Sequence, residues 1–328
     1  MNPGQATTGD GEPLLELRDV VVEYGGGVRA VAGVDLAVQR GETLAIVGES
    51  GCGKSSLARA IVHAPPPTSG EVRFAGVPLG SLSKRQLRRQ RPRLQMIFQD
   101  PISSLNPRRT ARQLVSEGAS VWRRDEPGRA AQVDADDLLR RVGIDPLRLG
   151  DRRPHQFSGG QCQRISIARA IAMQPELLVC DEPVSALDVS VQAQVLNLLR
   201  ALSRDLGLTL VFIAHDLAVV RNISHRVAVM YLGKIVEVGD VVSVYERPAH
   251  HYTGALLAAV PAVDELDRAH LRDVEAISGD VPSPADPPSG CRFRTRCPYA
   301  TERCAEEVPE LRPVGDDGHL VACHYPRR

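Results

Sequence analysis

Short runs of consecutive hydrophobic residues alternate along this chain with longer segments in which hydrophobic positions recur every three or four residues. The continuous runs predict strands that are covered on both faces, and they span residues 43–47, 177–180 and 209–214. The periodic segments predict helices over residues 54–62, 161–172 and 189–203. A further strand, rich in Val and Leu, is expected over residues 14–24, before a turn of three glycines. Buried strands that alternate with helices predict an α/β fold with a mostly parallel sheet.

The pattern changes in three places, which suggests how the chain is organised. Residues from about 101 to 170 are Arg-rich and helical in pattern, so we expect an inserted helical subdomain there. Residues 263–290 include the Pro-rich stretch GDVPSPADPPSG and predict a linker to a small C-terminal module over residues 291–328. Residues 1–12 are polar and Gly-rich, which predicts a disordered lead before a main domain over residues 13–262.

Composition narrows the class of protein. The chain has 328 residues, 43% of them hydrophobic, which is enough for a large core and about two domains. Its 40 basic and 40 acidic side chains give no net charge, which argues against a nucleic-acid binder that works through a bulk positive field. No hydrophobic run approaches the roughly 18 residues that a membrane span needs. The N-terminus lacks the pattern of a signal peptide, so we expect a cytosolic protein with reduced cysteines.

Residues 48–55 read GESGCGKS and match the pattern G-x-x-x-x-G-K-[ST] at every fixed position, between an expected buried strand and an expected helix. The glycines let the backbone wrap around phosphate oxygens, and the helix adds the positive end of its dipole. Lys54 is placed to reach the β- and γ-phosphates, and Ser55 to ligate Mg²⁺. A glycine-rich turn with a chance lysine is the alternative, but the chain has only three lysines. The predicted nucleoside triphosphate site comprises Gly48, Glu49, Ser50, Gly51, Cys52, Gly53, Lys54, Ser55 and Ser56.

Two acidic residues, Asp181 and Glu182, follow the expected strand over residues 177–180. The carboxyl end of a buried parallel strand is where an α/β sheet places its ligand chemistry. We expect Asp181 to hold Mg²⁺ through its water shell and Glu182 to polarise the attacking water. Acidic residues also gather at helix N-termini, so this interpretation depends on the phosphate loop.

Residues 157–161 read FSGGQ at the start of an expected helix and predict a second anion-binding loop. One nucleotide rarely needs two such loops from one chain, which indicates a site shared across a dimer. With these motifs in order, the chain resembles the ATP-binding cassette (ABC) ATPases. The resemblance matches Tyr24 to the aromatic that stacks on adenine, and His215 to the switch histidine that contacts the γ-phosphate. It matches Gln99 to the glutamine that links Mg²⁺ and the attacking water to the transport channel. The signature and D-loop residues are Ser158, Gly159, Gly160, Gln161 and Asp188.

The resemblance implies a P-loop NTPase core with an antiparallel β subdomain, the inserted helical subdomain and a small Cys-rich C-terminal extension. Two cassettes close head to tail, with each ATP between the phosphate loop of one and the signature of the other, and hydrolysis reopens them. Catalysis would rest on Glu182, His215, Gln99 and Lys54, and Mg²⁺ on Ser55, Gln99 and Asp181. Each of Tyr24, His215 and Gln99 alone would read as an ordinary strand aromatic, buried histidine or surface residue. Their order over some 200 residues favours the cassette.

Several segments narrow the resemblance to the ATPases of oligopeptide/dipeptide (peptide/nickel) importers. They are QDPISSLNPR, PHQFSGGQ, DEPVSALDVSVQAQVLNLL, RPAHHYTGALLAAVP, VPSPADPPSGCRFRTRCP and GHLVACH. The chain departs from the family at His251, where Pro is usual, and at Cys162, where Arg is more common. The resemblance implies a peripheral subunit at the cytoplasmic face of the cell membrane. Its expected partners are a paralogous ATPase subunit, which makes a heterodimer, two permease subunits and an extracytoplasmic binding protein.

The cargo and two other classes stay open at this point. Dipeptides, longer peptides, nickel complexes and glutathione are all carried by systems with this type of ATPase. A non-transport cassette of translation or DNA repair would carry two cassettes or a long coiled coil. The basic run over residues 84–93 lacks the interleaved aromatics of a nucleic-acid site, so no nucleic-acid partner is expected. A sugar-importer ATPase would need a β-rich regulatory domain in place of the cysteine tail.

Four of the seven cysteines lie in the last 38 residues, with the spacing C-x5-C-x6-C-x18-C: Cys291, Cys297, Cys304 and Cys323. Few apolar residues surround them, which suggests a metal-stapled loop structure. Zinc sites usually show closer pairs, and the resemblance favours a four-iron four-sulfur cluster over zinc. Reduced cysteines packed as small hydrophobes are the alternative, and His319 or His324 could supply a ligand. The remaining cysteines, Cys52, Cys162 and Cys180, look incidental.

Overall fold

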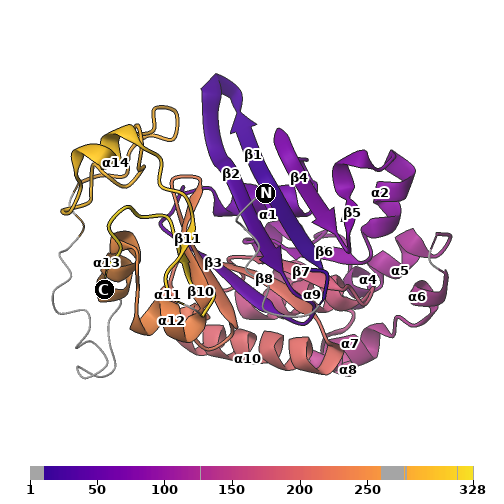
Figure 1. The fold of residues 1–328 in the computed structure, drawn as a ribbon. Coiled ribbons are helices and arrows are strands. Elements are labelled where there is room, and N and C mark those ends of the chain that lie inside the picture. The colour runs from indigo at the N-terminus through magenta and orange to yellow at the C-terminus, as the bar shows by residue number, and fades with distance from the viewer. Residues whose placement is uncertain (1–10, 126, 260–276, 278, 316, 328) are drawn as a thin grey trace. The chain divides into compact units, whose positions relative to one another are not determined.

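The computed structural model describes residues 11–125, 127–259, 277, 279–315 and 317–327 (Figure 1). Most of the expected lead (residues 1–12) and half of the expected linker (residues 263–276 and 278) lie outside these described residues. The chain divides into two compact units, residues 1–80 with 212–328, and residues 81–211. The domain boundaries expected from the sequence stay a prediction, because the division into two compact units follows other bounds and does not test them. In the part of the chain that the structure describes, every helix is too short or too polar to span a membrane.

The first unit begins with an antiparallel sheet of order β2-β1-β4-β5. Buried Leu15, Leu17, Val20 and Val22 lie along one strand, so hydrophobic residues of this sheet face a core. Its strands are β1 (Leu15–Tyr24), β2 (Val28–Val38), β4 (Ser69–Phe74) and β5 (Val77–Pro78). The β1–β2 hairpin turns through the three glycines of η1 (Gly25–Gly27), as the sequence predicts.

The first unit also contains strands in the order β11-β12-β10-β9-β3-β8. Every residue of β3 and β8 is buried, as the continuous hydrophobic runs predict, and β3 pairs in parallel with β9. The strands are β3 (Thr43–Val47), β8 (Thr209–Ala214), β9 (Arg226–Tyr231), β10 (Lys234–Asp240), β11 (Arg312–Pro313) and β12 (Leu320–Val321). The helices are α1 (Lys54–Ile61), α11 (Leu217–Val220), α12 (Val241–Glu246), α13 (His251–Ala259) and α14 (Glu302–Glu306). A short η2 (Leu79–Ser81) leads into the second unit.

The second unit contains β6, β7 and the first half of β8, in the order β8-β7-β6. The boundary between the two units falls within β8, after residue 211. Strand β7 (Leu177–Asp181) pairs in parallel with β6 (Leu94–Ile97), a strand that the sequence analysis missed. The helices that follow β6 are α3 (Pro101–Ser104), α4 (Ala111–Val115), α5 (Glu117–Trp122), α6 (Pro127–Ala131), α7 (Ala135–Arg141), α8 (Pro146–Leu149), η3 (Pro154–Gln156) and α9 (Gly159–Ile171). The unit is completed by α2 (Lys84–Gln90) and α10 (Val189–Leu206).

The C-terminal residues pack with the first unit. Strand β12 pairs antiparallel with β10, with Glu237 opposite Val321 and Val238 opposite Leu320. In Figure 1 the yellow C-terminal segment passes from α14 back to the β10 edge. Residues 291–328 therefore belong to the same compact unit as the loop over residues 48–55.

Candidate nucleotide-binding site

The phosphate loop of the first unit connects β3 to α1, as its sequence predicts. Gly48 has no room for a side chain, since a Cβ there would lie 2.1 Å from the carbonyl oxygen of Met230. Gly53, the N-cap of α1, has a φ of +109°, and its Cβ would lie 2.0 Å from the carbonyl oxygen of Ala30. Both glycines are therefore required for the close packing of this loop. The loop ends at the N-terminus of α1, where backbone N–H groups favour an anion.

The Lys54 side chain folds back into the loop. Its Nζ donates to the carbonyl oxygens of Gly48 at 2.7 Å and of Glu49 at 2.9 Å, and only 4% of the residue is exposed. Cys52 is also buried beside the ammonium group, and burial raises the pKa of its thiol despite the lysine charge. The loop thus holds one buried positive charge within a backbone of turned amides, an arrangement that suits phosphate.

Tyr24 and the serines of α1 lie near one another. The Tyr24 ring is 43% exposed, and its hydroxyl donates to Ser56 Oγ at 3.1 Å. Ser55 and Ser56 are both partly exposed in the first turn of α1. An exposed aromatic ring tied to the helix that ends the phosphate loop fits the role of a base-stacking residue, although that role stays a prediction. His215, the remaining residue of the first unit that is predicted to contact the nucleotide, is exposed directly after the carboxyl end of β8.

In the second unit, the parallel register of β6 and β7 brings two predicted residues together. Ile97 lies opposite Cys180, so Gln99 and Glu182, each two residues further on, leave the strands side by side. Gln99 Nε2 donates to Glu182 Oε2 at 2.9 Å. Asp181 ends β7 and is 3% exposed. The amide therefore orients the carboxylate that the sequence assigns to water activation.

Glu182 also has a strained backbone. Its φ of +45° is in the left-handed region, which costs a residue with a Cβ roughly 1–2 kcal/mol. Such strain persists only where the surrounding structure holds the residue in place. Glu182 is one of six described non-glycine residues with a positive φ, so its conformation alone does not mark it as functional.

The signature motif forms the N-terminus of α9. Ser158 is its N-cap, with a capping box in which Ser158 Oγ accepts from the Gln161 amide and Gln161 Oε1 accepts from the Ser158 amide. Gly159 is exposed, and a Cβ on Gly160 would come within 2.6 Å of the Val191 side chain. The N-terminus of α9 is therefore exposed, and an exposed helix N-terminus suits an anion even though Ser158 caps the Gln161 amide.

Asp188 caps α10 in the same unit. Its carboxylate accepts hydrogen bonds from the Val191 amide and the Ser190 hydroxyl. The Ser190 bond and then the backbone bond lower the pKa of Asp188, which keeps this cap ionised. The D-loop role of Asp188 stays a prediction.

Two residues that contact the phosphate loop were not among the predicted site residues. The Glu49 carboxylate is bound by Arg296, and the Glu49 amide donates to the Tyr252 hydroxyl. Both partners lie more than 200 residues from Glu49 in the chain. They stand in segments that carry the family resemblance, but no pattern in those segments indicates a contact with the phosphate loop.

The four C-terminal cysteines line one cavity, together with residues that include His250, Phe293 and His324. Burial raises the pKa of Cys323 to about 12, and the three other thiols act in the same direction. Among the described residues, however, no three His, Cys, Asp or Glu side chains are grouped so that they could hold a metal ion. The structure therefore shows no ligand set among the described residues for the metal centre expected from the cysteine spacing.

Two family models match this chain. Residues 31–185 match the model of the family "ABC transporter", and residues 236–304 match "Oligopeptide/dipeptide transporter, C-terminal region". The probable peptide ABC transporter ATP-binding protein y4tS of Sinorhizobium fredii is 53% identical over 90% of this chain and 82% of its own. The chain belongs to the ABC transporter family.

Further relatives and a solved structure place the whole chain within this family. The oligopeptide transport ATP-binding protein OppF of Escherichia coli is 49% identical over 90% of this cassette and 87% of its own length. AppF of Bacillus subtilis, with the same description, is 46% identical over 97% and 99%. The structure of cbiO1 from Clostridium perfringens, part of the ABC transporter complex cbiONQ, has a TM-score of 0.64 at 30% identity. It covers 72% of this cassette and 92% of cbiO1, which confirms the predicted ABC ATPase fold.

Proposed function

We propose that this cassette is the ATP-hydrolysing subunit of an importer that takes up dipeptides and oligopeptides through separate permease subunits. The observation that carries the proposal is the near full-length similarity to ATP-binding proteins of oligopeptide transport, including their C-terminal region. A generic cassette would share the nucleotide motifs alone. The cassette would lie at the cytoplasmic face of the membrane, against the permeases.

The proposed chemistry distributes the work among residues of both units. Lys54 and the loop amides bind the phosphates of ATP, and Tyr24 stacks on the adenine. Ser55, Gln99 and Asp181 offer hydroxyl, amide and carboxylate oxygens, the hard donors that suit Mg²⁺. Mg²⁺ neutralises charge on the phosphates when bound.

Water activation is assigned to the residues around Glu182. Glu182 accepts a hydrogen bond from Gln99, so its carboxylate is oriented to polarise a water for attack on the γ-phosphate. His215 contacts that phosphate group. Residues Ser158, Gly159, Gly160 and Gln161 bind the ATP held by the phosphate loop of a second, paralogous cassette, and Asp188 lies at the same interface.

Glu182→Gln tests the function directly. Cells that lack this gene are complemented with the wild type, with Glu182→Gln or with Glu302→Gln, a matched change at an exposed position in α14. We expect labelled dipeptide and oligopeptide uptake with the wild type and Glu302→Gln, and none with Glu182→Gln. The purified Glu182→Gln chain should still bind ATP, because it loses only the group that polarises the water.

Two outcomes would contradict parts of this proposal. Normal ATP turnover by Glu182→Gln would remove Glu182 from its role. Unchanged peptide uptake in cells without the gene would keep the ATPase and move the cargo to nickel complexes or glutathione, or to a process other than transport.

For the cysteines we propose a four-iron four-sulfur cluster held by Cys291, Cys297, Cys304 and Cys323. The support is that all four thiols line one cavity. The resemblance to the importer ATPases favours the cluster over zinc, whose sites usually have more closely spaced cysteine pairs. Anaerobic purification followed by iron and sulfide analysis tests the proposal. No iron in the wild type would end it, and Cys52→Ala is the control that should leave the iron content unchanged.

A further inference from the structure

The phosphate loop carries an acidic side chain at its second position, Glu49, beside the group that must bind an anion. A carboxylate in such a loop opposes the phosphates of ATP, because like charges repel strongly where water is partly excluded. Glu49 keeps 27% of its side chain exposed. Its charge therefore needs a compensating partner if the loop is to bind phosphate well.

That partner comes from the C-terminal segment. Arg296 Nη1 donates to Glu49 Oε2 at 2.7 Å, and Nη2 donates to Oε1 at 3.0 Å. The Arg296 side chain is 7% exposed, and the hydrogen bond to Glu49 is the main reason its pKa is raised. A bidentate pair with a buried guanidinium is among the strongest and most directional charge contacts in proteins.

The backbone of Glu49 is fixed as well. Its amide donates to the Tyr252 hydroxyl at 2.9 Å, and its carbonyl oxygen accepts from Lys54 Nζ at 2.9 Å. One residue of the loop thus joins α13, the C-terminal segment and the phosphate-binding lysine. A shift of Glu49 would move a hydrogen-bond partner of Lys54.

A buried aromatic cluster supports these contacts. The rings of Tyr231 and Tyr252 meet edge-on with centroids 4.7 Å apart, and Phe293 packs against both at 5.3 and 5.4 Å. The Arg296 guanidinium lies over the Tyr231 ring, 5.8 Å from its centroid. Phe293 also lines the cysteine cavity, so the same cluster connects that cavity to the loop.

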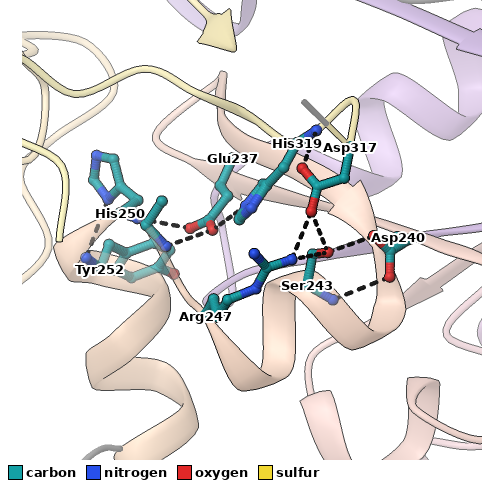
Figure 2. Close-up of polar contacts among 9 residues, drawn as sticks. Glu237, Asp240, Ser243, Arg247, His250, Tyr252, Asp317 and His319 are labelled. Atoms are coloured by element: carbon teal, nitrogen blue, oxygen red, sulfur yellow. Dashed lines mark hydrogen bonds and ion pairs between the residues drawn. The ribbon is translucent and has the colours of Figure 1, made fainter. Parts of the chain in front are cut away.

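A second set of polar contacts holds the C-terminal segment in place (Figure 2). Glu237 is fully buried and accepts from the backbone amides of Ala249 and His250, just before α13, and it pairs with His319 Nε2 at 2.7 Å. Asp317 accepts from Ser243 on α12 and from Arg247, the C-cap of that helix. One carboxylate therefore ties the start of the helix that carries Tyr252 to the segment that carries Arg296.

We propose that Arg296 is a positioning residue of the nucleotide site, which neutralises Glu49 and holds it against the C-terminal segment, so that residues 291–328 set the ATP affinity of the loop. The inference rests on the proposed binding of ATP by this loop. The C-terminal segment would then affect the binding of ATP, whether or not its cysteines hold a metal cluster.

A double-mutant cycle with the full-length chain tests this inference. The variants are Arg296→Ala, Glu49→Gln and the two combined, with Arg303→Ala as control, because Arg303 pairs with Glu307 on exposed α14. Arg296→Ala should raise the Kd for Mg-ATP roughly tenfold, because it leaves the Glu49 charge uncompensated in the loop. Adding Glu49→Gln should recover most of that loss, whereas damage to packing alone would persist. In the assembled importer, Arg296→Ala should raise KM for ATP more than it lowers kcat.

Each result decides one question. An unchanged Kd in Arg296→Ala, or a loss that Glu49→Gln fails to recover, would overturn the inference. If Arg296→Ala does not fold, Arg296→Lys replaces it, since it keeps the charge without the fork and should raise Kd by a smaller factor. If the wild type and Arg303→Ala fail to bind Mg-ATP, the proposed function fails instead, so the two failures are distinguishable.

Discussion

At the scale of single residues, His250 shows how burial fixes a protonation state. It is 1% exposed, and its Nδ1 accepts the Tyr252 amide, a bond that only an unprotonated ring nitrogen can make. Burial first, and then the neighbouring His251, lower the pKa of His250 to about 3. Because His250 has an ordinary pKa of 6.5 in the unfolded chain, it takes up a proton there first as the pH falls. The stability that neutral His250 provides is therefore present above pH 6.5 and is lost as the pH falls toward 3.

This linkage predicts a measurable pH dependence. Between pH 6.5 and 5, the unfolding free energy of the wild type should fall faster than that of His250→Asn, by about 1.4 kcal/mol per pH unit. Asn offers an oxygen near the position of Nδ1 but does not titrate, so the two proteins differ mainly in this proton. Urea unfolding at several pH values gives both slopes. Parallel slopes would mean that His250 is protonated in the folded chain.

The same scale shows what the sequence could predict of the site. Lys54, Asp181 and Glu182 stand in motifs whose spacing reflects local chemistry. The position of Lys54 at the start of a helix, and of the two carboxylates at the end of a buried strand, therefore follows from pattern alone. The pairing of Gln99 with Glu182 depends on the register of β6 and β7, and the positive φ of Glu182 on the packing around it. Arg296 depends on contacts across more than 200 residues, which no local pattern encodes.

At the scale of elements, Glu237 on β10 predicts how the C-terminal segment is attached. Glu237→Ala removes the acceptor for two backbone amides and His319, all in buried surroundings. Loss of such an acceptor typically costs about 2–5 kcal/mol. We expect a lower denaturation midpoint and faster proteolysis within residues 291–328. Glu310→Ala, which breaks only the exposed pair with Arg312, should change neither. Equal proteolysis of the two variants would show that Glu237 does not hold the segment.

The strands that the sequence predicted include the fully buried β3, β7 and β8, but not β2, β9 and β10, which are at least as long. The runs over residues 43–47 and 209–214 match β3 and β8, because burial on both faces leaves a continuous hydrophobic run. Strands β6 and β12, of four and two residues, are too short to show a repeating hydrophobic pattern. Their strand conformation depends on pairing with β7 and β10. Helix α9 begins at Gly159, two residues before the helix expected over residues 161–172, because Ser158 and Gln161 form a capping box.

At the scale of the whole molecule, the two compact units hold different parts of the predicted nucleotide site. The first unit takes residues from both ends of the chain and holds the phosphate loop and the C-terminal segment. The second unit is one continuous stretch, residues 81–211, and holds Glu182 and the signature. It is wider than the helical subdomain expected over residues 101–170, because it also includes β6, β7 and α10, so that expectation stays a prediction. Nothing local in residues 291–328 shows that they pack with the unit of the phosphate loop.

The proposed head-to-tail pairing predicts that two variants of this one chain disable different ATP sites. In that pairing, Ser158 contacts the ATP held by the phosphate loop of the other cassette, while Lys54 contacts the ATP held by its own. Ser158→Arg should therefore leave ATP binding by the isolated chain unchanged, whereas Lys54→Ala should weaken it. In the importer assembled with both ATPase subunits, Ser158→Arg should lower ATP turnover roughly a hundredfold, because a donor to the transferred phosphate is lost.

Isothermal titration of the isolated chain and ATPase assays of the assembled importer measure the two effects. Ser120→Arg, an exposed serine on α5 of the same unit, is the matched control and should behave as the wild type in both. If Ser158→Arg weakened ATP binding by the isolated chain as much as Lys54→Ala does, the signature would act within its own chain. A site shared between two cassettes would explain why one chain has two helix N-termini in motifs that predict anion binding, because each would then serve a different nucleotide.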